Sequence, residues 1–279
     1  MVSILPDSEK LKIGTSTNDL VGIKKALKKC APLASQGWLV YIAQIDTNIE
    51  FGLFRGASNP IAVKVDDALI DTNNKGLIVV KISQIAEECV EIKCSNDSAH
   101  YVYLDHRSEK TFPPNHYLEA LVSTISQKIP INLKEVTENY LSRLLYEALR
   151  DSHGCLVAVT DKNKPPSFLS DAILLEEPIN FPDLISKLQK GEVQPSVLDS
   201  KKALVKGMFN SDGIVIFDNK GRLIGYNCFV PIQKKNDVNG GARKRAFSEL
   251  SSRIGKGLIA AFIRSQDGGT DYKDDKDEQ

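Results

Sequence analysis

Residues 211–227, Ser-Asp-Gly-Ile-Val-Ile-Phe-Asp-Asn-Lys-Gly-Arg-Leu-Ile-Gly-Tyr-Asn, decide the architecture of the C-terminal half of the chain. The apolar run 213–217 predicts a buried strand, and Asp218-Asn-Lys-Gly221 predicts a tight turn. Residues 222–227 return as a second strand, so the whole stretch predicts a β-hairpin. A buried hairpin of this kind requires further strands and covering helices, and candidates for both occur nearby.

Apolar strands and helices flank this hairpin on both sides. Residues 154–160 and 257–264 are short, continuous apolar runs, which predict two further core strands. Helices are expected at 181–190, 200–209 and 241–254. Strands that alternate with helices predict an α/β domain with a mixed sheet flanked by helices.

The N-terminal half predicts a second unit of α/β or α+β type. Residues 38–43 and 49–54 are β-rich runs separated by a polar turn, which indicates a hairpin. A helix is expected before the hairpin, at 19–29, and strands are expected after it, at 76–82, 90–93 and 100–104. No motif in this half assigns it a role.

A long helix over 132–151 is expected to join the two halves. Asn132 followed by Glu135 has the pattern of a helix N-terminus, and an apolar stripe along the helix predicts a core-facing side. We therefore expect four parts: an N-terminal domain at 1–131, the connecting helix at 132–151, a second domain at 152–266 and a solvated acidic tail at 267–279.

Composition excludes several classes of protein. The 36 Lys and Arg equal the 36 Asp and Glu, which argues against a bulk polyelectrolyte role. No run of about 18 apolar residues occurs, so neither a spanning helix nor a membrane partner is expected. The N-terminus lacks the basic start and apolar run of a secretory signal. Five cysteines without a CxxC pair favour reduced thiols in a cytoplasmic protein, and the four histidines lack zinc-ligand spacing.

Residues 201–264 carry an excess of positive charge that the neutral total conceals. This segment holds thirteen Lys or Arg and four Asp or Glu, a net charge of +9. Such an excess indicates a surface that handles anions. The alternative is a basic face that is simply solvated, and charge alone does not decide between the two.

The run Asn239-Gly240-Gly241-Ala242-Arg243-Lys244-Arg245 lies within this basic segment. Glycines before a helix let the backbone approach a phosphate closely, and the helix start directs free N–H groups and a positive dipole at it. Arg243 and Arg245 would add guanidinium groups, which bind phosphate oxygens in pairs. The alternative is a capped surface helix with exposed arginines.

The segments Ser211-Asp212-Gly213-Ile214 and Gly241-Ala242-Arg243-Lys244-Arg245-Ala246 together resemble the signature of the diadenylate cyclase domain, the DisA N-terminal domain superfamily. That family has Asp-Gly-Ala at a helix-to-strand junction and Gly-Thr-Arg-His-Arg-Ala at the start of a later helix. The order of the surrounding elements is similar, and the resemblance covers about residues 145–273. It implies a DisA-N-like mixed sheet flanked by helices.

The resemblance also implies roles for individual residues. In active members two domains meet face to face, each with one ATP, which implies a homo-oligomer with ATP or a related nucleotide as its ligand. Asp212 would be the catalytic carboxylate, would contact the nucleotide and would hold Mg²⁺ or Mn²⁺. Asp267 could supply a second carboxylate for the metal, or it could belong to the acidic tail. Gly213 would contact the nucleotide through its backbone. The later segment would supply the remaining nucleotide-binding residues, Gly241, Ala242, Arg243, Lys244 and Arg245.

The sequence departs from the family at three positions. Ala242 replaces a Thr, Lys244 replaces a His, and Gln266 replaces the first Glu of a later motif. Loss of a charged metal-facing carboxylate harms catalysis more than binding, which favours a domain that senses an adenine nucleotide or nucleotide second messenger. Two alternatives stay open: an active diadenylate cyclase that makes a cyclic dinucleotide from two ATP, and an adaptor that binds protein or nucleic acid through the basic surface.

Overall fold

The chain folds into two compact units, which are described separately. The computed structural model describes residues 10–34, 37–57, 59–71, 78–86, 89–95, 98–104, 113, 115–169, 172–231, 241–265 and 269–275. The first unit comprises Met1–Ile82 and Ile92–His100, and the second comprises Ser83–Glu91 and Tyr101–Gln279. The described residues form seven α-helices and twelve strands in three sheets, which confirms the predicted mixed α/β class.

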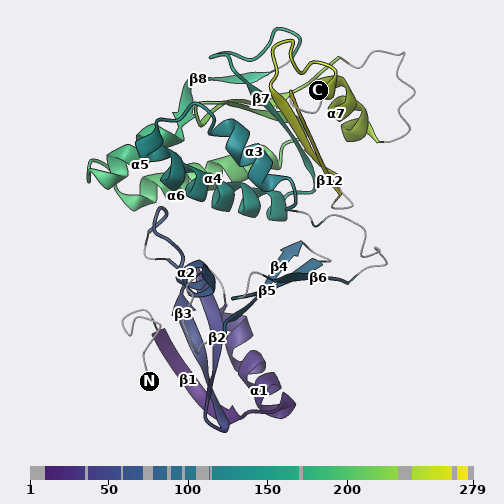
Figure 1. Ribbon diagram of the computed structural model, residues 1–279. Helices are drawn as coiled ribbons and strands as arrows, with labels where there is room; N and C mark the ends of the chain where they lie inside the picture. Colours follow the sequence, from purple (N-terminus) through teal and green to yellow (C-terminus); the bar gives the residue numbers. More distant parts are fainter. Residues whose placement is uncertain are drawn as a thin grey trace. The chain divides into compact units, whose positions relative to one another are not determined.

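The first unit is built on a three-stranded antiparallel sheet in the order β1-β3-β2 (Figure 1). Asp19 accepts a hydrogen bond from the Gly22 N–H at 2.7 Å and so begins α1 as its N-cap. One face of α1 packs against Ile49, Phe51 and Leu53 of β3. The predicted hairpin and helix are confirmed, whereas the first strand was missed. The elements are β1 (Lys10–Thr17), α1 (Leu20–Cys30), a short 3-10 helix (Ala31–Leu33), β2 (Trp38–Ile45), β3 (Asn48–Arg55) and α2 (Val65–Asp71).

A buried carboxylate lies on the opposite face of this small sheet. Glu50 follows Ile49 in β3, so its side chain points away from α1. The Nζ atoms of Lys12 and Lys10 lie 2.7 and 2.9 Å from its oxygens, and the Tyr41 hydroxyl donates to it at 3.0 Å. Hydrogen bonds from Lys12 and then Lys10 lower the pKa of Glu50 to about 2. Glu50 is therefore a charged member of a packed polar cluster.

A second small sheet has the order β4-β5-β6. Its strands are β4 (Val80–Ala86), β5 (Cys89–Cys94) and β6 (Ala99–Tyr103), and the division between the two units runs through them. The strand expected at 76–82 begins only at Val80, and residues 72–77 lie outside the described part of the chain. The other two strands lie within a residue or so of their predicted positions.

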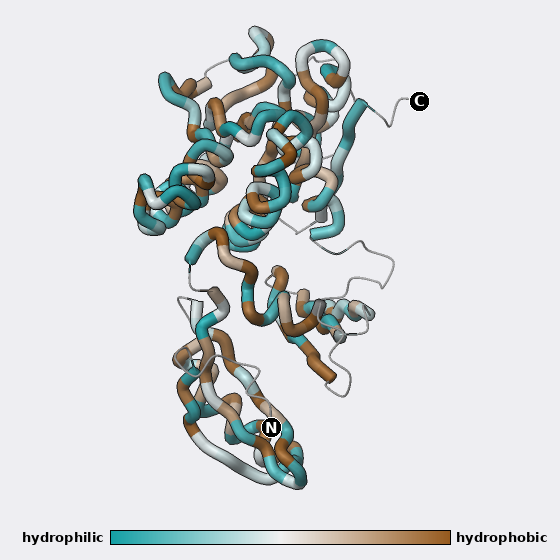
Figure 2. The backbone as a smooth tube through the Cα atoms, turned by 60° about the vertical axis from the view of Figure 1, so that its left-hand side comes forward, coloured by the Kyte–Doolittle hydropathy of each residue, from teal (hydrophilic) through white to brown (hydrophobic). Residues whose placement is uncertain are grey.

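Four helices of the second unit lie on the side of its sheet away from α7 (Figure 1). Helix α4 buries seven residues and contacts α3, α5 and α6, so the helix expected to connect two domains is packed inside one unit. It begins at Ile131 after Pro130, and Asn132 is therefore not its N-cap, contrary to the prediction. Helical turns alternate between brown and teal in Figure 2, as expected where one face meets a core. These helices are α3 (Leu118–Ile125), α4 (Ile131–Asp151), α5 (Phe181–Gln189) and α6 (Pro195–Phe209).

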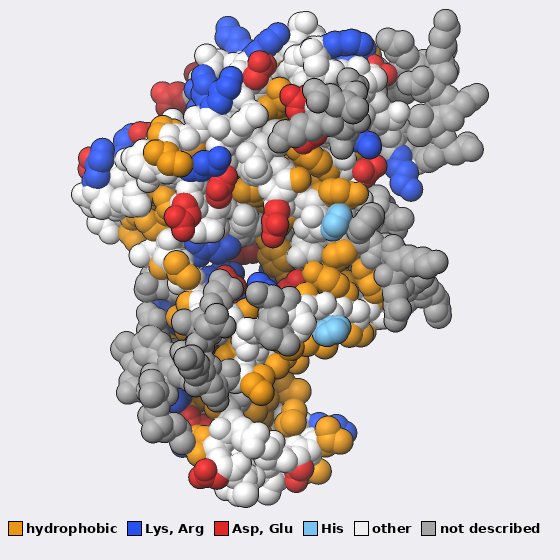
Figure 3. Space-filling model, in the orientation of Figure 1, with side chains coloured by type: hydrophobic (Ala, Val, Ile, Leu, Met, Phe, Trp, Pro, Cys, Tyr) orange, Lys and Arg blue, Asp and Glu red, His pale blue; other side chains and the backbone are white. Residues whose placement is uncertain are grey.

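The second unit is organised around a six-stranded sheet in the order β12-β11-β7-β9-β10-β8. The central strands β7 and β9 run parallel, and the other pairings are antiparallel. Acidic and basic side chains are interspersed over the face shown in Figure 3. The strands are β7 (Cys155–Thr160), β8 (Ile173–Asn180), β9 (Ile214–Asp218), β10 (Arg222–Cys228), β11 (Ala260–Arg264) and β12 (Thr270–Asp274).

Part of the expected acidic tail belongs to this sheet. Residues 270–274 form the edge strand β12 and pair with β11 along its whole length. Tyr272 is buried, its hydroxyl lies 2.7 Å from Thr124 Oγ1, and its ring stacks on Tyr117. This buried aromatic residue explains why such a charged segment is ordered as a strand rather than solvated. Residues 276–279 lie outside the described part.

Candidate functional site

The candidate site lies at the amino ends of the two parallel strands. Leu156 of β7 pairs with Ile214 of β9, so the residues that precede the two strands share one edge of the sheet. These are His153 and Gly154 before β7, and Asp212 and Gly213 before β9. The six-stranded sheet thus brings the Asp-Gly segment beside the loop that precedes β7.

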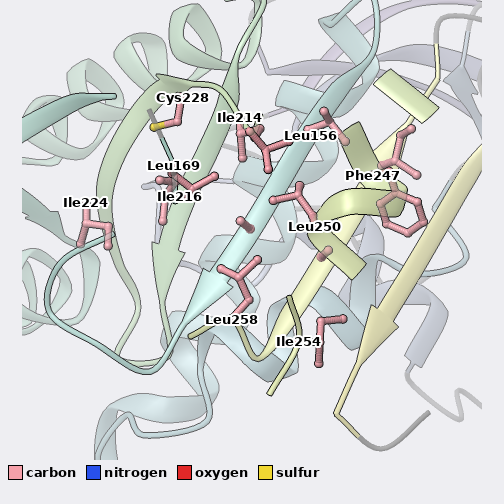
Figure 4. Close-up of a cluster of buried hydrophobic side chains, with 14 residues drawn as sticks. Leu156, Leu169, Ile214, Ile216, Ile224, Cys228, Phe247, Leu250, Ile254 and Leu258 are labelled. Atoms are coloured by element: carbon pink, nitrogen blue, oxygen red, sulfur yellow. The ribbon is translucent and has the colours of Figure 1, made fainter. Parts of the chain in front are cut away.

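Helix α7 (Ala242–Ser251) is held against this sheet by a cluster of buried apolar side chains (Figure 4). Phe247 and Leu250 of the helix pack with Leu156, Ile214 and Cys228 of three different strands. Because the buried face of α7 is fixed by these contacts, the direction of its first turn is fixed as well. That turn carries the Arg-Lys-Arg segment.

Arg243 and Asp212 face each other across the site. Arg243 Nη2 lies 3.7 Å from Asp212 Oδ1, and Arg243 Nη1 donates a hydrogen bond to the His153 carbonyl at 3.0 Å. The Asp212 side chain is 94% exposed and that of Arg243 is 30% exposed. The structure therefore joins the two sequence segments that carry the resemblance. Because Asp212 is exposed and Arg243 is partly exposed, both groups are accessible to a ligand. A solvated pair at this distance contributes little to stability.

Gly213 is required by a close approach of two backbones. A Cβ atom at this position would lie 2.3 Å from the Asn227 Cα atom. Asn227 has a φ of 50° and lies in a β-bulge of β10, where residues 225 and 228 pair with 216 and 214 of β9. The bulge and the glycine together form a rigid wall beside Asp212. Sequence reasoning offered no signal for the bulge, because Asn tolerates left-handed backbone but does not require it.

The first turn of α7 is exposed, and within the described residues its N–H donors are unsatisfied. Gly241 is the N-cap, with φ −65° and ψ 171°, and no side chain caps the helix. Among the described residues, the N–H groups of Ala242, Arg243 and Lys244 have no acceptor. Lys244 and Arg245 are exposed and make no contact with Asp212 in the described structure, because successive helical residues point in different directions. Only Arg243 turns toward the carboxylate.

The metal-binding prediction rests on one described carboxylate. Asp267 and Gln266 lie outside the described residues, so the structure does not place the second predicted metal ligand. In the part of the chain that is described, no three His, Cys, Asp or Glu side chains are grouped so that they could hold a metal ion. Asp212 by itself is an incomplete ligand set for a divalent cation.

Buried thiols near the site are not nucleophiles. Burial raises the pKa of the Cys155 thiol to about 12, and burial likewise raises the pKa of Cys228 to about 12. Thiols that stay protonated at neutral pH are poor nucleophiles and metal ligands. The arrangement is therefore suited to binding an anion through Arg243 and the start of α7, rather than to covalent catalysis by cysteine.

The basic segment 201–264 does not form one surface. Lys202 and Lys206 pair with Glu147 and Asp151 of α4, at 2.6 and 2.5 Å, and Arg253 contacts Glu249 at 2.8 Å. Residues 243–245 lie at the amino end of the β7–β9 pair, whereas Lys220, Arg222 and Lys256 lie at its other end. Lys234 and Lys235 lie outside the described residues. The net charge of +9 is thus divided between ion pairs and two separate regions.

Comparison of the sequence with family models and curated proteins found no match. Within the described residues, none of the helices combines the length and the apolar character needed to cross a membrane.

Proposed function

We propose that the second unit binds an adenine nucleotide or a nucleotide second messenger at the amino ends of β7 and β9, and that it senses this ligand. The observation that carries the proposal is the meeting of Arg243 and Asp212 at 3.7 Å, beside the glycine required at position 213. In the sequence these are the two segments that resemble the diadenylate cyclase domain. Their convergence at one exposed edge supports a common ligand.

Phosphate recognition would use groups that are already oriented. Arg243 makes one hydrogen bond to the His153 carbonyl and one long contact with Asp212, both of which a phosphate oxygen can replace. The free N–H groups of the first turn of α7, together with the helix dipole, add attraction for an anion. Lys244 and Arg245 are exposed beside them and raise the local positive potential. Gly213 and the Asn227 bulge would limit the space for the rest of the nucleotide.

The positions at which this sequence departs from the diadenylate cyclase family favour sensing over catalysis. Ala242 has no hydroxyl to offer a phosphate, and Gln266 has no charge to offer a metal ion. Mg²⁺ or Mn²⁺ would need Asp212 and Asp267 together, and no step of the proposal depends on the metal. The first unit would then gate or recruit in response to the ligand. A face-to-face homo-oligomer and a cytoplasmic location belong to the same proposal, the latter because the cysteines in the described structure are all free.

The test is isothermal titration calorimetry with ATP and with cyclic dinucleotides, each with and without Mg²⁺. Arg243→Ala and Arg245→Ala should each weaken binding at least about tenfold, since each removes a charge-assisted phosphate contact. Lys187→Ala is the matched control, because Lys187 is an exposed cation on α5 paired with Asp183. Unchanged binding in both arginine variants would refute the proposed site.

The competing function is an active diadenylate cyclase. Incubation with ATP and Mn²⁺, followed by mass spectrometry, would detect a cyclic dinucleotide product. We expect none from the wild-type protein. A product that disappears in Asp212→Ala would replace the sensing proposal with a catalytic one.

A further inference from the structure

The carboxyl ends of β7 and β9 form a second region of converging loops. Thr160, the last residue of β7, accepts a hydrogen bond from the Asn219 N–H at 3.1 Å through its carbonyl oxygen. Its hydroxyl donates to the Gly257 carbonyl at 2.8 Å. The loop after β7, the β9–β10 turn and the loop before β11 are therefore tied to one another. Ligands of open α/β sheets commonly bind at the carboxyl ends of parallel strands.

Two cations in this region meet on one neutral acceptor. Lys220 Nζ and Arg222 Nη2 donate to Asn163 Oδ1 at 3.1 and 2.8 Å. Because both nitrogens contact the same oxygen, they lie no more than about 6 Å apart, a separation that a single phosphate group can bridge. An amide oxygen carries no full charge, so an anion at this position would be held more strongly than Asn163 is.

The lysines around this acceptor lack counterions among the residues that the structure describes. Lys162, Lys164, Lys220 and Lys256 are exposed, and within the described part of the chain none of them has an ion-pair partner. By contrast, Lys187, Lys202 and Lys206 elsewhere in this unit are each paired with a carboxylate. We call the five cations of this region the carboxyl-end patch: Lys162, Lys164, Lys220, Arg222 and Lys256.

Acidic groups near the carboxyl-end patch do little to neutralise it. Asp218 is only 1% exposed and is occupied by Arg222, whose Nε lies 2.6 Å from Asp218 Oδ2. Asp161 is exposed on the same loop as Lys162. On the loops that carry the patch, five cations against these two carboxylates leave a net charge of +3. Asp274 and Asp275 lie at the same edge of the sheet, at the end of β12 and beside Ile259.

We infer that the carboxyl-end patch binds the phosphodiester backbone of a nucleic acid. Lysines on adjacent loops supply separate point charges, which suit a row of phosphates, and electrostatic contact of this kind is independent of base sequence. This surface is distinct from the proposed nucleotide site, because β9 separates Asp218 from Ile214 by about 13 Å. The inference does not depend on the proposed function, and either can fail without the other.

The test is fluorescence anisotropy with labelled single-stranded and duplex DNA of about 20 nucleotides, at salt concentrations from about 50 to 200 mM. The wild-type protein should bind, with an affinity that falls steeply as salt increases. Lys162→Glu combined with Lys164→Glu should reduce affinity at least about tenfold and flatten the salt dependence, because two phosphate contacts are lost. Lys187→Glu is the control for a general change of charge, and circular dichroism confirms that each variant is folded.

Three results would overturn the inference. The first is no binding by the wild-type protein at the lowest salt concentration. The second is binding that the double charge reversal leaves unchanged or that Lys187→Glu weakens equally. The third is displacement of the labelled DNA by inorganic phosphate at a concentration equal to that of the phosphate groups in the oligonucleotide. That result would indicate a site for a single anion instead of a nucleic-acid backbone.

Discussion

The two ends of the β7–β9 pair use the same residue types in different ways. At the amino end Asp212 is exposed and Arg243 is partly exposed; the two lie 3.7 Å apart and are held by few other contacts. At the carboxyl end Asp218 is buried, and its oxygens accept from the Lys220 N–H, the Arg222 N–H and the Arg222 guanidinium. Asp218 is therefore a structural acceptor that burial and hydrogen bonds hold in place, whereas Asp212 is exposed and available to a ligand.

The largest effect should come from breaking the buried pair. Asp218→Ala leaves the Arg222 guanidinium and two backbone N–H groups without their acceptor, which should cost about 3–5 kcal/mol of unfolding free energy. Asp212→Ala should leave the free energy of unfolding unchanged, because its side chain is almost wholly exposed. Urea unfolding of both variants measures this difference. Equal destabilisation would contradict the distinction between the two ends.

Glu50 offers a second buried carboxylate among cations, in the first unit. Its pKa is lowered to about 2 in the folded state, so its contribution is complete above the ordinary value of 4.5 and is lost as the pH falls toward 2. Because the Lys12 side chain is half-exposed and solvent screens its charge, the shift corresponds to about 1–2 kcal/mol of unfolding free energy. Trp38 is the single tryptophan and packs against the core of this unit, so its fluorescence reports unfolding there. In Glu50→Gln, the unfolding free energy of this unit should change much less as the pH falls. If its pH profile is identical to that of the wild type, the charged cluster does not stabilise the unit.

Most of the fold could be predicted from the sequence, and there are physical reasons why two of the strands could not. The continuous apolar runs of β7 and β9 are buried on both faces and were identified directly. Strand β8 was missed because Glu176-Glu177-Pro178 interrupts its apolar pattern, and it pairs only with β10 at the sheet edge. Strand β12 was missed because a single buried residue, Tyr272, anchors an otherwise charged segment.

The candidate site was predictable in its residue types and not in its geometry. The Asp-Gly and Arg-Lys-Arg segments could be selected from glycine placement, charge and resemblance. Which of Arg243, Lys244 and Arg245 turns toward Asp212 depends on the rotation of α7, and the packing of Phe247 and Leu250 sets that rotation. The net charge of +9 indicated an anion-handling surface or a solvated basic face, and the fold distributes these charges over two ends of the sheet.

Two glycines near the amino end should respond differently to an added methyl group. Gly213→Ala places a Cβ against the Asn227 backbone and should cost about 1–3 kcal/mol of stability while displacing the wall beside Asp212. Gly241→Ala has no atom within 4 Å of the new Cβ and should leave the free energy of unfolding within about 0.5 kcal/mol of wild type. Thermal unfolding compares the pair. Tolerance of Ala at 213 would show that the close approach is not required.

The smallest expected effect concerns the exposed pair itself. Asp212→Asn removes the negative charge that faces Arg243 and any approaching phosphate, so nucleotide binding without divalent cations should strengthen by about two- to fivefold. The measurement is calorimetric titration in the presence of a chelator. Weaker binding in this variant would indicate that Asp212 contacts the nucleotide directly.

The most direct test of the account is nucleotide titration of three proteins under one condition: wild type, Arg243→Ala, and the double charge reversal at Lys162 and Lys164. If the nucleotide binds at the amino ends of β7 and β9, Arg243→Ala loses binding at least about tenfold and the double variant binds as wild type does. Loss of nucleotide binding in the double variant with retention in Arg243→Ala would contradict the assignment of the two ends.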